Sequence, residues 1–332
     1  MPRVSGAPTG EYLDRPTAVP AGGTAVTSPL VTAVVTTYNR PDHLRSAVES
    51  VREQTYDNVE LVVVDDHSET PAREVLADVD LDSLATHQVV RHETNRGANA
   101  ARNTGIDAAG GEYVAFLDDD DRWRPKKLAR QVHAIEADEA AGVAYCGIKR
   151  VLPDEARIEI PDPVDGDMTK ALLCANVVGS MSVALVETAV AEQVPLDERF
   201  PCWADLEWFV HLSRETAFTR IPEPLVVYDC ESPGRLTEDF EKTQRGYELF
   251  VEEFEPLAAG YGDRFRRKFR AWAAFRAGKS AFHAGQYGRA RELLSSAVRD
   301  YPYEPQFATY LLAALGGERT HTLGQRVQAL RS

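Results

Sequence analysis

Four short apolar segments alternate with helical patterns between positions 30 and 135, and this alternation limits the fold more than any other feature. Leu44, Val48 and Val51 recur at helical spacing between the first two segments. The four strand-like segments are Leu30–Thr37, Val59–Val64, Gln88–His92 and Tyr113–Leu117. Continuous apolar strands that alternate with helices are typical of a parallel sheet covered on both faces. The sequence therefore predicts a doubly wound, mostly parallel α/β domain.

Polar side chains directly follow three of these segments. Tyr38 follows the first, Asp65 and Asp66 end the second, and the run 118–121 of four aspartates follows the fourth. In doubly wound sheets, ligands bind at the carboxyl ends of the strands. We therefore expect these side chains to meet at one edge of the sheet.

The charge of the chain is large and unevenly distributed. The net charge is −15, and 30 of the 37 basic residues are Arg. An acidic, Lys-poor chain favours an origin in a halophilic prokaryote, although GC-rich codon usage alone can raise the Arg content. The acidity argues against general nucleic-acid binding, because binding of phosphates needs clustered cations. Residues 260–332 nevertheless carry a net +8.

The cysteines and the apolar runs point to a reduced compartment. The four residues Cys146, Cys174, Cys202 and Cys230 form no C-x-x-C pair, so we expect reduced, mostly buried thiols rather than a zinc site or a disulfide framework. No run approaches the ~18 apolar residues of a membrane span, and the N-terminal segment lacks the pattern of a signal peptide. We therefore predict a cytoplasmic protein.

The four consecutive aspartates give the strongest chemical signal. Carboxylates crowded at a strand end repel one another unless a cation offsets their charge. Oxygen ligands suit Mg²⁺ or Mn²⁺, which commonly hold a diphosphate together with one or two protein carboxylates. The alternative is a solvated acidic turn. An apolar strand leading directly into four acids favours the metal site.

The context of the aspartates resembles the family 2 glycosyltransferases. Four blocks match that family in order and spacing: Val34–Arg40, Glu60–Ser68, Asn95–Gly105 and Gly111–Asp121. The resemblance covers about residues 30–135 with high specificity and extends more weakly to about 230. It implies a GT-A type, Rossmann-like fold. It also implies a nucleotide-diphospho-sugar donor and a Mg²⁺ or Mn²⁺ cofactor.

The resemblance also implies roles for individual residues. Tyr38 would stack on the nucleobase, Asp66 would accept a hydrogen bond from a base N–H, and Arg102 would contact the diphosphate. The alternatives are a loop tyrosine, a turn-forming aspartate and a surface ion pair. The implied nucleotide-sugar residues are Thr36, Tyr38, Arg40, Asp66, Arg102, Asp118 and Asp119. The implied metal ligands are Asp118 and Asp120.

The catalytic base is expected in the helix near Trp203–Glu215. In the family a Glu-Asp pair opens such a helix, and its Asp deprotonates the acceptor hydroxyl. Asp205 matches that Asp, but Ala204 stands where the Glu is usual. Glu207 is the second candidate, and a solvated helix carboxylate is the structural alternative.

The chain divides into three predicted parts. Residues 1–29 read as a flexible leader. Residues 30–235 read as a GT-A glycosyltransferase domain, with a nucleotide-sugar half at 30–135 and an acceptor half at 136–235. Residues 236–332 read as a helical appendage, in which Gly278 to Pro302 keep the spacing of one tetratricopeptide (TPR)-like hairpin.

A basic, aromatic helix is predicted at residues 264–276, within the appendage. Phe265, Phe269, Trp272 and Phe275 recur at helical spacing among cations. One interpretation is peripheral contact with an anionic membrane, which would bring the enzyme to a lipid-linked acceptor. The favoured interpretation is that the aromatic side chains form the core contact of the appendage.

Together these features predict an inverting, metal-dependent glycosyltransferase. It would use a nucleotide-sugar donor, such as a UDP-sugar, and a glycan or polyprenyl-linked acceptor, in the cytoplasm or at the inner face of the membrane. Two alternatives stay open. A nucleotidyltransferase would need a Gly-rich phosphate loop after the first strand, which Thr36–Pro41 lacks. A non-catalytic scaffold with the same fold is favoured only by Ala204.

Overall fold

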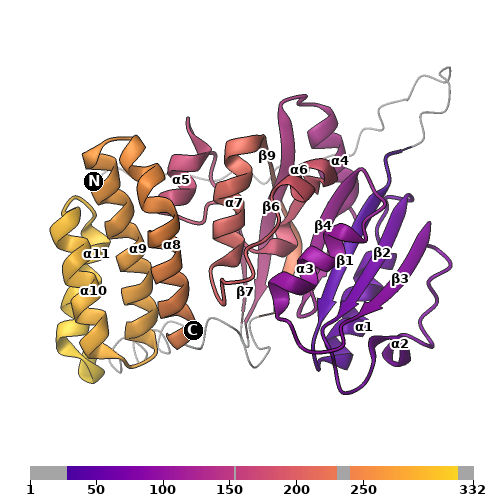
Figure 1. The fold of residues 1–332 in the computed structure, drawn as a ribbon, viewed down its shortest axis with the longest axis horizontal. Helices are drawn as coiled ribbons and strands as arrows, with labels where there is room; N and C mark the ends of the chain where they lie inside the picture. The colour runs from indigo at the N-terminus through magenta and orange to yellow at the C-terminus, as the bar shows by residue number, and fades with distance from the viewer. Residues whose placement is uncertain (1–27, 153–154, 230–239, 321–332) are drawn as a thin grey trace, which may run out of the picture.

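In the part of the chain that the structure describes, one large sheet is flanked by helices, and four further helices stand side by side at one end (Figure 1). The computed structural model describes residues 28–152, 155–229 and 240–320. Almost all of the predicted leader, residues 1–29, lies outside the described residues, and so does Cys230. The three other cysteines are buried free thiols.

The first half of the sheet is parallel, as the sequence predicts. Its strands are β1 (Val31–Thr37), β2 (Val59–Asp65), β3 (Thr86–Arg91) and β4 (Tyr113–Asp118). They lie in the order β3-β2-β1-β4, and every pair among them is parallel. The connecting helices are α1 (Pro41–Arg52), α2 (Ala72–Val75) and α3 (Ala98–Asp107).

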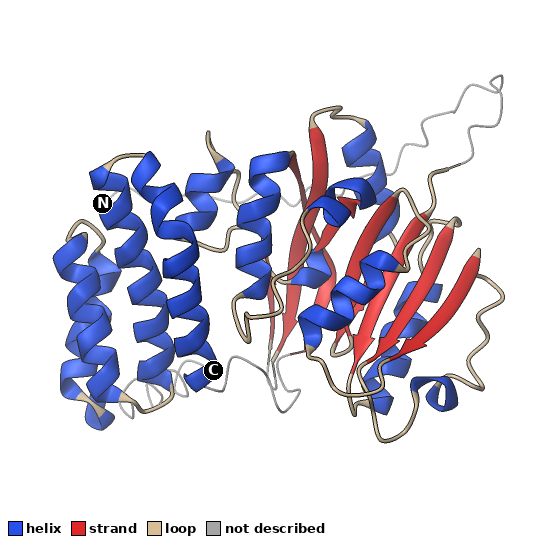
Figure 2. Ribbon diagram, viewed as in Figure 1, coloured by secondary structure: helices blue, strands red, loops and turns tan. Residues whose placement is uncertain are grey.

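Helices cover both faces of this half (Figure 2) because the strands are apolar on both sides. Leu44, Val48 and Val51 of α1 are at most 1% exposed, and burial of each such side chain contributes roughly 1.5–3 kcal/mol. Helix α3 comes close to β1 through Gly105, where a Cβ atom would lie 2.3 Å from Val34 Cγ1. A larger residue at position 105 would push α3 off the sheet.

The second half of the chain completes a nine-stranded sheet. Its strands are β5 (Asp121–Trp123), β6 (Ala141–Val151), β7 (Ala156–Glu159), β8 (Ala184–Glu187) and β9 (Ala217–Asp229). Its helices are α4 (Lys127–Glu136), α5 (Met168–Cys174), the 3₁₀ turn η1 (Met181–Val183), α6 (Thr188–Gln193) and α7 (Ala204–Glu215).

The predicted mostly parallel sheet is in fact mixed. Beyond β4 the strand order is β8-β6-β9-β5, and β7 pairs with the C-terminal part of β6, Ile148–Val151. Strand β8 is antiparallel to both β4 and β6, β7 is antiparallel to β6, and β5 is antiparallel to β9. Only the β6–β9 pair is parallel in this half. The prediction extended the pattern of the N-terminal part, and beyond β4 strands no longer alternate regularly with long crossover helices.

The predicted helical tail is confirmed for the described residues. Its helices are α8 (Phe240–Gly260), α9 (Asp263–His283), α10 (Tyr287–Asp300) and α11 (Pro305–Gly316). Phe250, Phe254 and Phe269 belong to the same apolar cluster as the sheet, whereas Phe275 and Phe307 belong to a second cluster. The division at residue 236 and the TPR-like character of α9 and α10 stay predictions.

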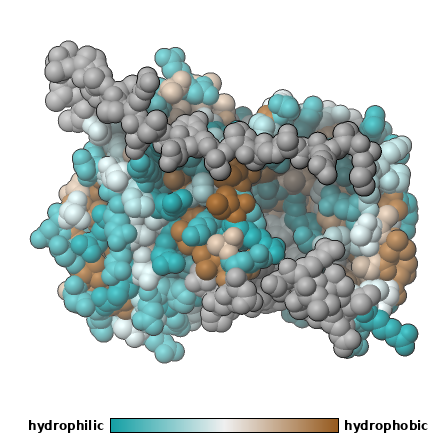
Figure 3. All heavy atoms as spheres, turned by 180° about the vertical axis from the view of Figure 1, so that it is seen from behind, coloured by the Kyte–Doolittle hydropathy of each residue, from teal (hydrophilic) through white to brown (hydrophobic). Residues whose placement is uncertain are grey.

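The basic, aromatic segment at 264–276 forms the first part of α9. Phe269 and Phe275 are buried, and Phe265 and Trp272 are partly buried against the two clusters. This arrangement agrees with a core contact. Among the described residues, no helix is both long and apolar enough to span a bilayer. Figure 3 shows a largely hydrophilic rear face with a few apolar groups.

Candidate active site

The carboxyl ends of β1, β2, β3 and β4 form the edge on which the candidate residues gather. The strand register aligns Thr36 with Asp118, and Thr37 with Asp65. Asp65 in turn is aligned with Arg91 of β3. The parallel arrangement therefore brings together side chains from four separate segments of the sequence.

A two-residue turn, Asp119-Asp120, joins β4 to β5 and is tied to the loop after β1. Thr37 Oγ1 donates to Asp119 Oδ2 at 2.8 Å, and Arg40 Nη1 lies 3.1 Å from Asp119 Oδ1 and 3.2 Å from Asp120 Oδ2. Burial, reinforced by the charge of Asp120, raises the pKa of Asp119 to about 6, although Thr37 and Arg40 oppose the shift. Burial is therefore the main reason that the Asp119 carboxylate ionises less readily than an exposed aspartate.

Arg102 of α3 also reaches this edge, where it pairs with Asp118 at the end of β4. Its Nη2 donates to Asp118 Oδ1 at 2.6 Å, and its Nη1 donates to Asn99 Oδ1 at 3.1 Å. The backbone N–H of Asp118 donates to Ser182 Oγ in η1. Arg102 is 8% exposed, so its guanidinium is largely enclosed and held in a fixed direction.

Asp66 anchors the loop that leads into α3. Its carboxylate accepts hydrogen bonds from the backbone N–H groups of Arg96 and Gly97, at 2.8 and 2.7 Å, and Asp66 Oδ1 lies 2.7 Å from His92 Nδ1. Gly97 has φ +93°, a conformation that glycine adopts without steric cost. Asp66 is 4% exposed, and its Oδ2 keeps a lone pair for one further donor.

Tyr38 and Thr36 are the more accessible residues at this edge. Tyr38 is 47% exposed, and Thr36 is partly exposed. Asn39, directly after Tyr38, has φ +55° and is fixed by bonds to Ser68 and Glu69. Positive φ is uncommon for a non-glycine residue and occurs often at functional sites.

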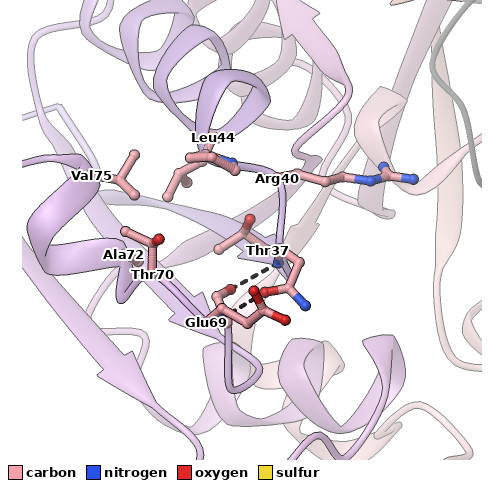
Figure 4. Close-up of a pocket in the computed structure, with 10 residues that line it drawn as sticks. Thr37, Arg40, Leu44, Glu69, Thr70, Ala72 and Val75 are labelled. Carbon is pink, nitrogen blue, oxygen red and sulfur yellow. Dashed lines mark hydrogen bonds between the residues drawn. The ribbon is translucent and has the colours of Figure 1, made fainter.

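A cavity of about 270 Å³ opens beside this loop. It is lined by residues of the loops after β1 and β2 and of helices α1 and α2, among them Thr37, Leu44 and Val75. Figure 4 shows that Arg40 extends away from Leu44 and Val75. Thr37 and Arg40 line the cavity and also bond to Asp119, so they belong to both the cavity wall and the acidic turn.

The acidic turn fits a hard divalent cation chemically. The carboxylates of Asp118 and Asp120 are 29% and 17% exposed, and each is paired with an arginine. Among the described residues, no group of three or more His, Cys, Asp or Glu forms a complete metal cage. Mg²⁺ and Mn²⁺ do not need such a cage when substrate phosphates supply further oxygens.

Asp205 lies in the first turn of α7, next to the acidic edge. Its Oδ2 accepts a hydrogen bond of 3.0 Å from Asn176 Nδ2. Burial raises the pKa of Asp205, and the charges of Arg102 and Asp118 are near enough to act on it. The chain enters α7 through Trp203, which has the left-handed φ of +65°. Such a conformation is a clear outlier for a bulky residue.

Glu207 occupies a different environment on the same helix. It is 2% exposed, and its Oε1 lies 3.2 Å from Nε2 of His211. Burial raises its pKa, while the hydrogen bond from His211 opposes the shift. His211 also lies 3.6 Å from Glu253 of α8. Glu207 therefore faces the helical end of the molecule, whereas Asp205 has Arg102 and Asp118 near it.

Sequence reasoning missed three residues that shape the site: His92, Asn176 and Ser182. His92 directly follows β3, so the rule that located Asp66 at a strand end could have found it. Asn176 and Ser182 lie in irregular segments around η1, where no periodic pattern marks them. Their roles depend on a loop path that only the fold reveals.

Comparisons with known proteins agree with this geometry. Residues 32–161 match the model of the family described as glycosyl transferase family 2. An uncharacterized glycosyltransferase from Haemophilus influenzae is 26% identical over 231 residues, which cover 68% of this chain and 77% of that protein.

Two further proteins are informative because of what their names state. A UDP-Glc:alpha-D-GlcNAc-diphosphoundecaprenol beta-1,3-glucosyltransferase, WfaP, from Escherichia coli is 32% identical over 111 residues, but these cover only 33% of this chain and 42% of that protein. Among solved structures, the mannosyltransferase PcManGT from Pyrobaculum calidifontis, in complex with GDP-Man and Mn²⁺, superposes with a TM-score of 0.54 over 87% of each chain at 21% identity. At this level of identity the superposition establishes the GT-A fold.

Proposed function

We propose that this chain, whose residues 32–161 match the model of glycosyl transferase family 2, moves a sugar from a nucleotide-diphospho-sugar to an acceptor hydroxyl with inversion at the anomeric carbon. We propose a UDP-sugar as the donor and a glycan or lipid-linked glycan as the acceptor. The observation that carries the proposal is the acidic turn after β4, held between Arg40 and Arg102 at the edge where parallel sheets bind ligands.

The proposed donor site spans the carboxyl ends of β1, β2 and β4. Tyr38 offers an exposed ring on which a base can stack, and the free lone pair of Asp66 selects a base with an N–H edge, as uracil has. Arg102 suits the diphosphate, because a guanidinium binds phosphate oxygens through two parallel hydrogen bonds. The name of the E. coli relative, which includes UDP-Glc, supports the choice of uridine.

Asp118 and Asp120 are the proposed ligands of Mg²⁺ or Mn²⁺, and Asp119 is proposed to face the ribose. A bound divalent cation supplies positive charge that stabilises the departing nucleoside diphosphate. Arg40 and Arg102, which pair with these carboxylates in the free protein, are then available to phosphate oxygens. The Mn²⁺ named with the Pyrobaculum mannosyltransferase supports this cofactor.

Asp205 is the proposed general base. It removes the proton of the acceptor hydroxyl while that oxygen attacks the anomeric carbon from the face opposite the leaving group. Asn176 donates to Asp205 Oδ2, and the backbone N–H of Leu206 donates to Oδ1. Oδ1 keeps a second lone pair, which can accept the proton of the acceptor hydroxyl. Glu207 remains the second candidate for the base, although its hydrogen bond with His211 disfavours it.

We propose that the reaction takes place in the cytoplasm or at the inner face of the membrane, where a polyprenyl-linked acceptor would present its sugar. The E. coli relative is named for such a diphosphoundecaprenol acceptor. Any membrane contact of α9 would involve exposed cations such as Arg264 and Arg267, because its aromatic rings pack inward.

The decisive experiment has two steps. First, the melting temperature of the protein is measured with Mn²⁺ alone, with UDP alone and with both. A ligand at about 100 times its dissociation constant adds about 2.7 kcal/mol of stability, so the combination should raise the melting temperature most. Second, slow hydrolysis of a panel of UDP-, GDP- and dTDP-sugars is followed, since hydrolysis needs no acceptor.

The outcomes separate the three functions. Hydrolysis of one sugar nucleotide to nucleoside diphosphate and sugar supports the glycosyltransferase. Synthesis of a sugar nucleotide from a nucleoside triphosphate would instead identify a nucleotidyltransferase. If no nucleotide changes the melting temperature, the non-catalytic scaffold becomes the better interpretation, and Ala204 in place of the usual Glu is the feature that favours it.

A further inference from the structure

Arg276 is a partly buried cation in the middle of α9, far in sequence from every residue of the proposed site. Its Nη1 atom is inaccessible to solvent and has no hydrogen-bond partner among the described residues. Burial lowers the pKa of Arg276 to about 10, so the side chain is still charged near neutral pH, and the charge of Asp205 opposes the shift. Enclosing a charge with incomplete hydrogen bonding costs stability, so its position needs an explanation.

Two contacts of Arg276 suggest that explanation. Its Nη2 donates to the carbonyl oxygen of Cys174 at 3.0 Å, and its Cζ lies 5.0 Å from the centroid of the Trp203 ring. Cys174 is the last residue of α5, two residues before Asn176. Trp203 is the left-handed residue two positions before Asp205. Arg276 therefore holds both segments that carry the Asn176–Asp205 hydrogen bond.

We propose that Arg276 is a positioning residue that fixes the direction of the Asp205 carboxylate by clamping the end of α5 against the start of α7. The inference rests on the proposed function, because it assigns Asp205 the role of base. It goes beyond that function in placing part of the catalytic apparatus in α9, a helix outside residues 32–161 that match the family. Figure 1 shows α5 and α7 between the sheet and the C-terminal helices, which is the arrangement that such a clamp requires.

The chemistry of arginine suits this task better than that of lysine. A planar guanidinium can stack on an indole ring while an N–H in its plane donates to a carbonyl oxygen. A lysine ammonium is a compact charge without a face to stack on. Exchange of Arg276 for Lys should therefore preserve the charge but weaken the clamp.

The test compares Arg276→Met with Arg270→Met. Arg270 lies six residues earlier on the same helix, is exposed, and is 3.5 Å from Glu255, so its loss removes a surface ion pair only. Arg276→Met should lower kcat for sugar transfer or donor hydrolysis by about 10- to 100-fold, the usual cost of losing a group that orients a reacting one. KM for the donor and the affinity for UDP should stay within about two-fold of the wild type, because the clamp does not touch the donor site.

Two readouts separate positioning from loss of folding. Millimolar guanidinium chloride should restore part of the kcat that Arg276→Ala loses. Arg276→Lys should keep part of the wild-type kcat without added guanidinium. The backbone N–H of Gly179 donates to Asn176 Oδ1, and that of Leu206 donates to Asp205 Oδ1. Exchange of these two amides should be faster in Arg276→Met than in Arg270→Met, a measurement that needs no activity. Wild-type kcat in Arg276→Met, or equal exchange in the two variants, would overturn the clamp.

The clamp and the proposed function can fail separately. If the wild-type protein neither binds nor hydrolyses any sugar nucleotide, the proposed function is wrong, and amide exchange alone decides whether Arg276 holds the two segments. If the wild type is active and Asp205→Asn is not, but Arg276→Met matches Arg270→Met, the function stands and the clamp is rejected.

Discussion

The two halves of the sheet show how differently a sequence can encode a binding site. In the parallel half, each proposed donor residue lies at or directly after the end of a strand, or on α3 beside one, so the strand pattern alone brings them together. In the mixed half, Asp205 depends on an irregular loop for Asn176 and on a distant helix for the contacts of Arg276. One half is specified by local pattern, and the other by tertiary packing.

The largest expected effect tests the less predictable half. Asp205→Asn should lower transfer by about 10²- to 10⁴-fold, because general base catalysis typically contributes that much. UDP binding, measured by calorimetry, should be unchanged, since Asp205 lies outside the proposed donor contacts. Glu207→Gln is the matched control on the same helix, and we expect it to keep most of its activity. An inactive Glu207→Gln beside an active Asp205→Asn would exchange the two roles.

The next effect tests the parallel half. Asp120→Asn should reduce metal-dependent turnover by about 10²- to 10³-fold, comparable to the loss of one group that stabilises charge in a transition state. The expected sign is a loss of both Mn²⁺ affinity and kcat, because the variant removes a charged ligand. Asp42→Asn, an exposed acid at the start of α1, is the control. Near-normal activity with Mn²⁺ would reject Asp120 as a ligand.

A smaller effect is expected at Tyr38. Replacement by Ala should weaken UDP binding by about 1–3 kcal/mol, or roughly 5- to 150-fold, if the exposed ring stacks on the base. Tyr38→Phe keeps the aromatic face and should bind UDP almost as the wild type does. If the two variants weaken binding equally, the hydroxyl rather than the ring face makes the contact.

Periodicity predicted the four strands and the helical tail. The strand-end rule predicted the edge on which the polar residues gather. The parallel order failed after β4 because the later connections are irregular. For instance, β9 follows α7 after a single residue, Thr216, and pairs with β6 through several shifts of register. No pattern could have linked Arg276 to Asp205 across the intervening sequence, since the link depends on how α9 packs against α5. Local rules locate a residue on an edge, but they do not show what a distant helix adds to it.

The smallest effect, on stability alone, concerns the mixed half of the sheet, where α4 packs over β6 and β9. Lys127 is fully buried there, its Nζ donates to Gln131 Oε1 at 2.6 Å, and it lies 4.1 Å from the centroid of the Trp123 ring. Burial lowers the pKa of Lys127 to about 7. Gln131 also donates to the carbonyl oxygens of Ala144 in β6 and Val183 in η1, so the pair ties α4 to the mixed half of the sheet.

The pH dependence of stability follows from that lowered pKa. Between pH 7 and the value of about 10.5 for an exposed lysine, the unfolded chain binds the proton and the folded protein does not, so stability should rise with pH. We expect a gain of about 2 kcal/mol in the free energy of unfolding between pH 7 and 9, measured by urea denaturation. Lys127→Met should remove most of this gain, whereas Lys126→Met, an exposed neighbour, should keep it. An unchanged slope in Lys127→Met would show that Lys127 stays protonated within the fold, and that this buried site tolerates a charge.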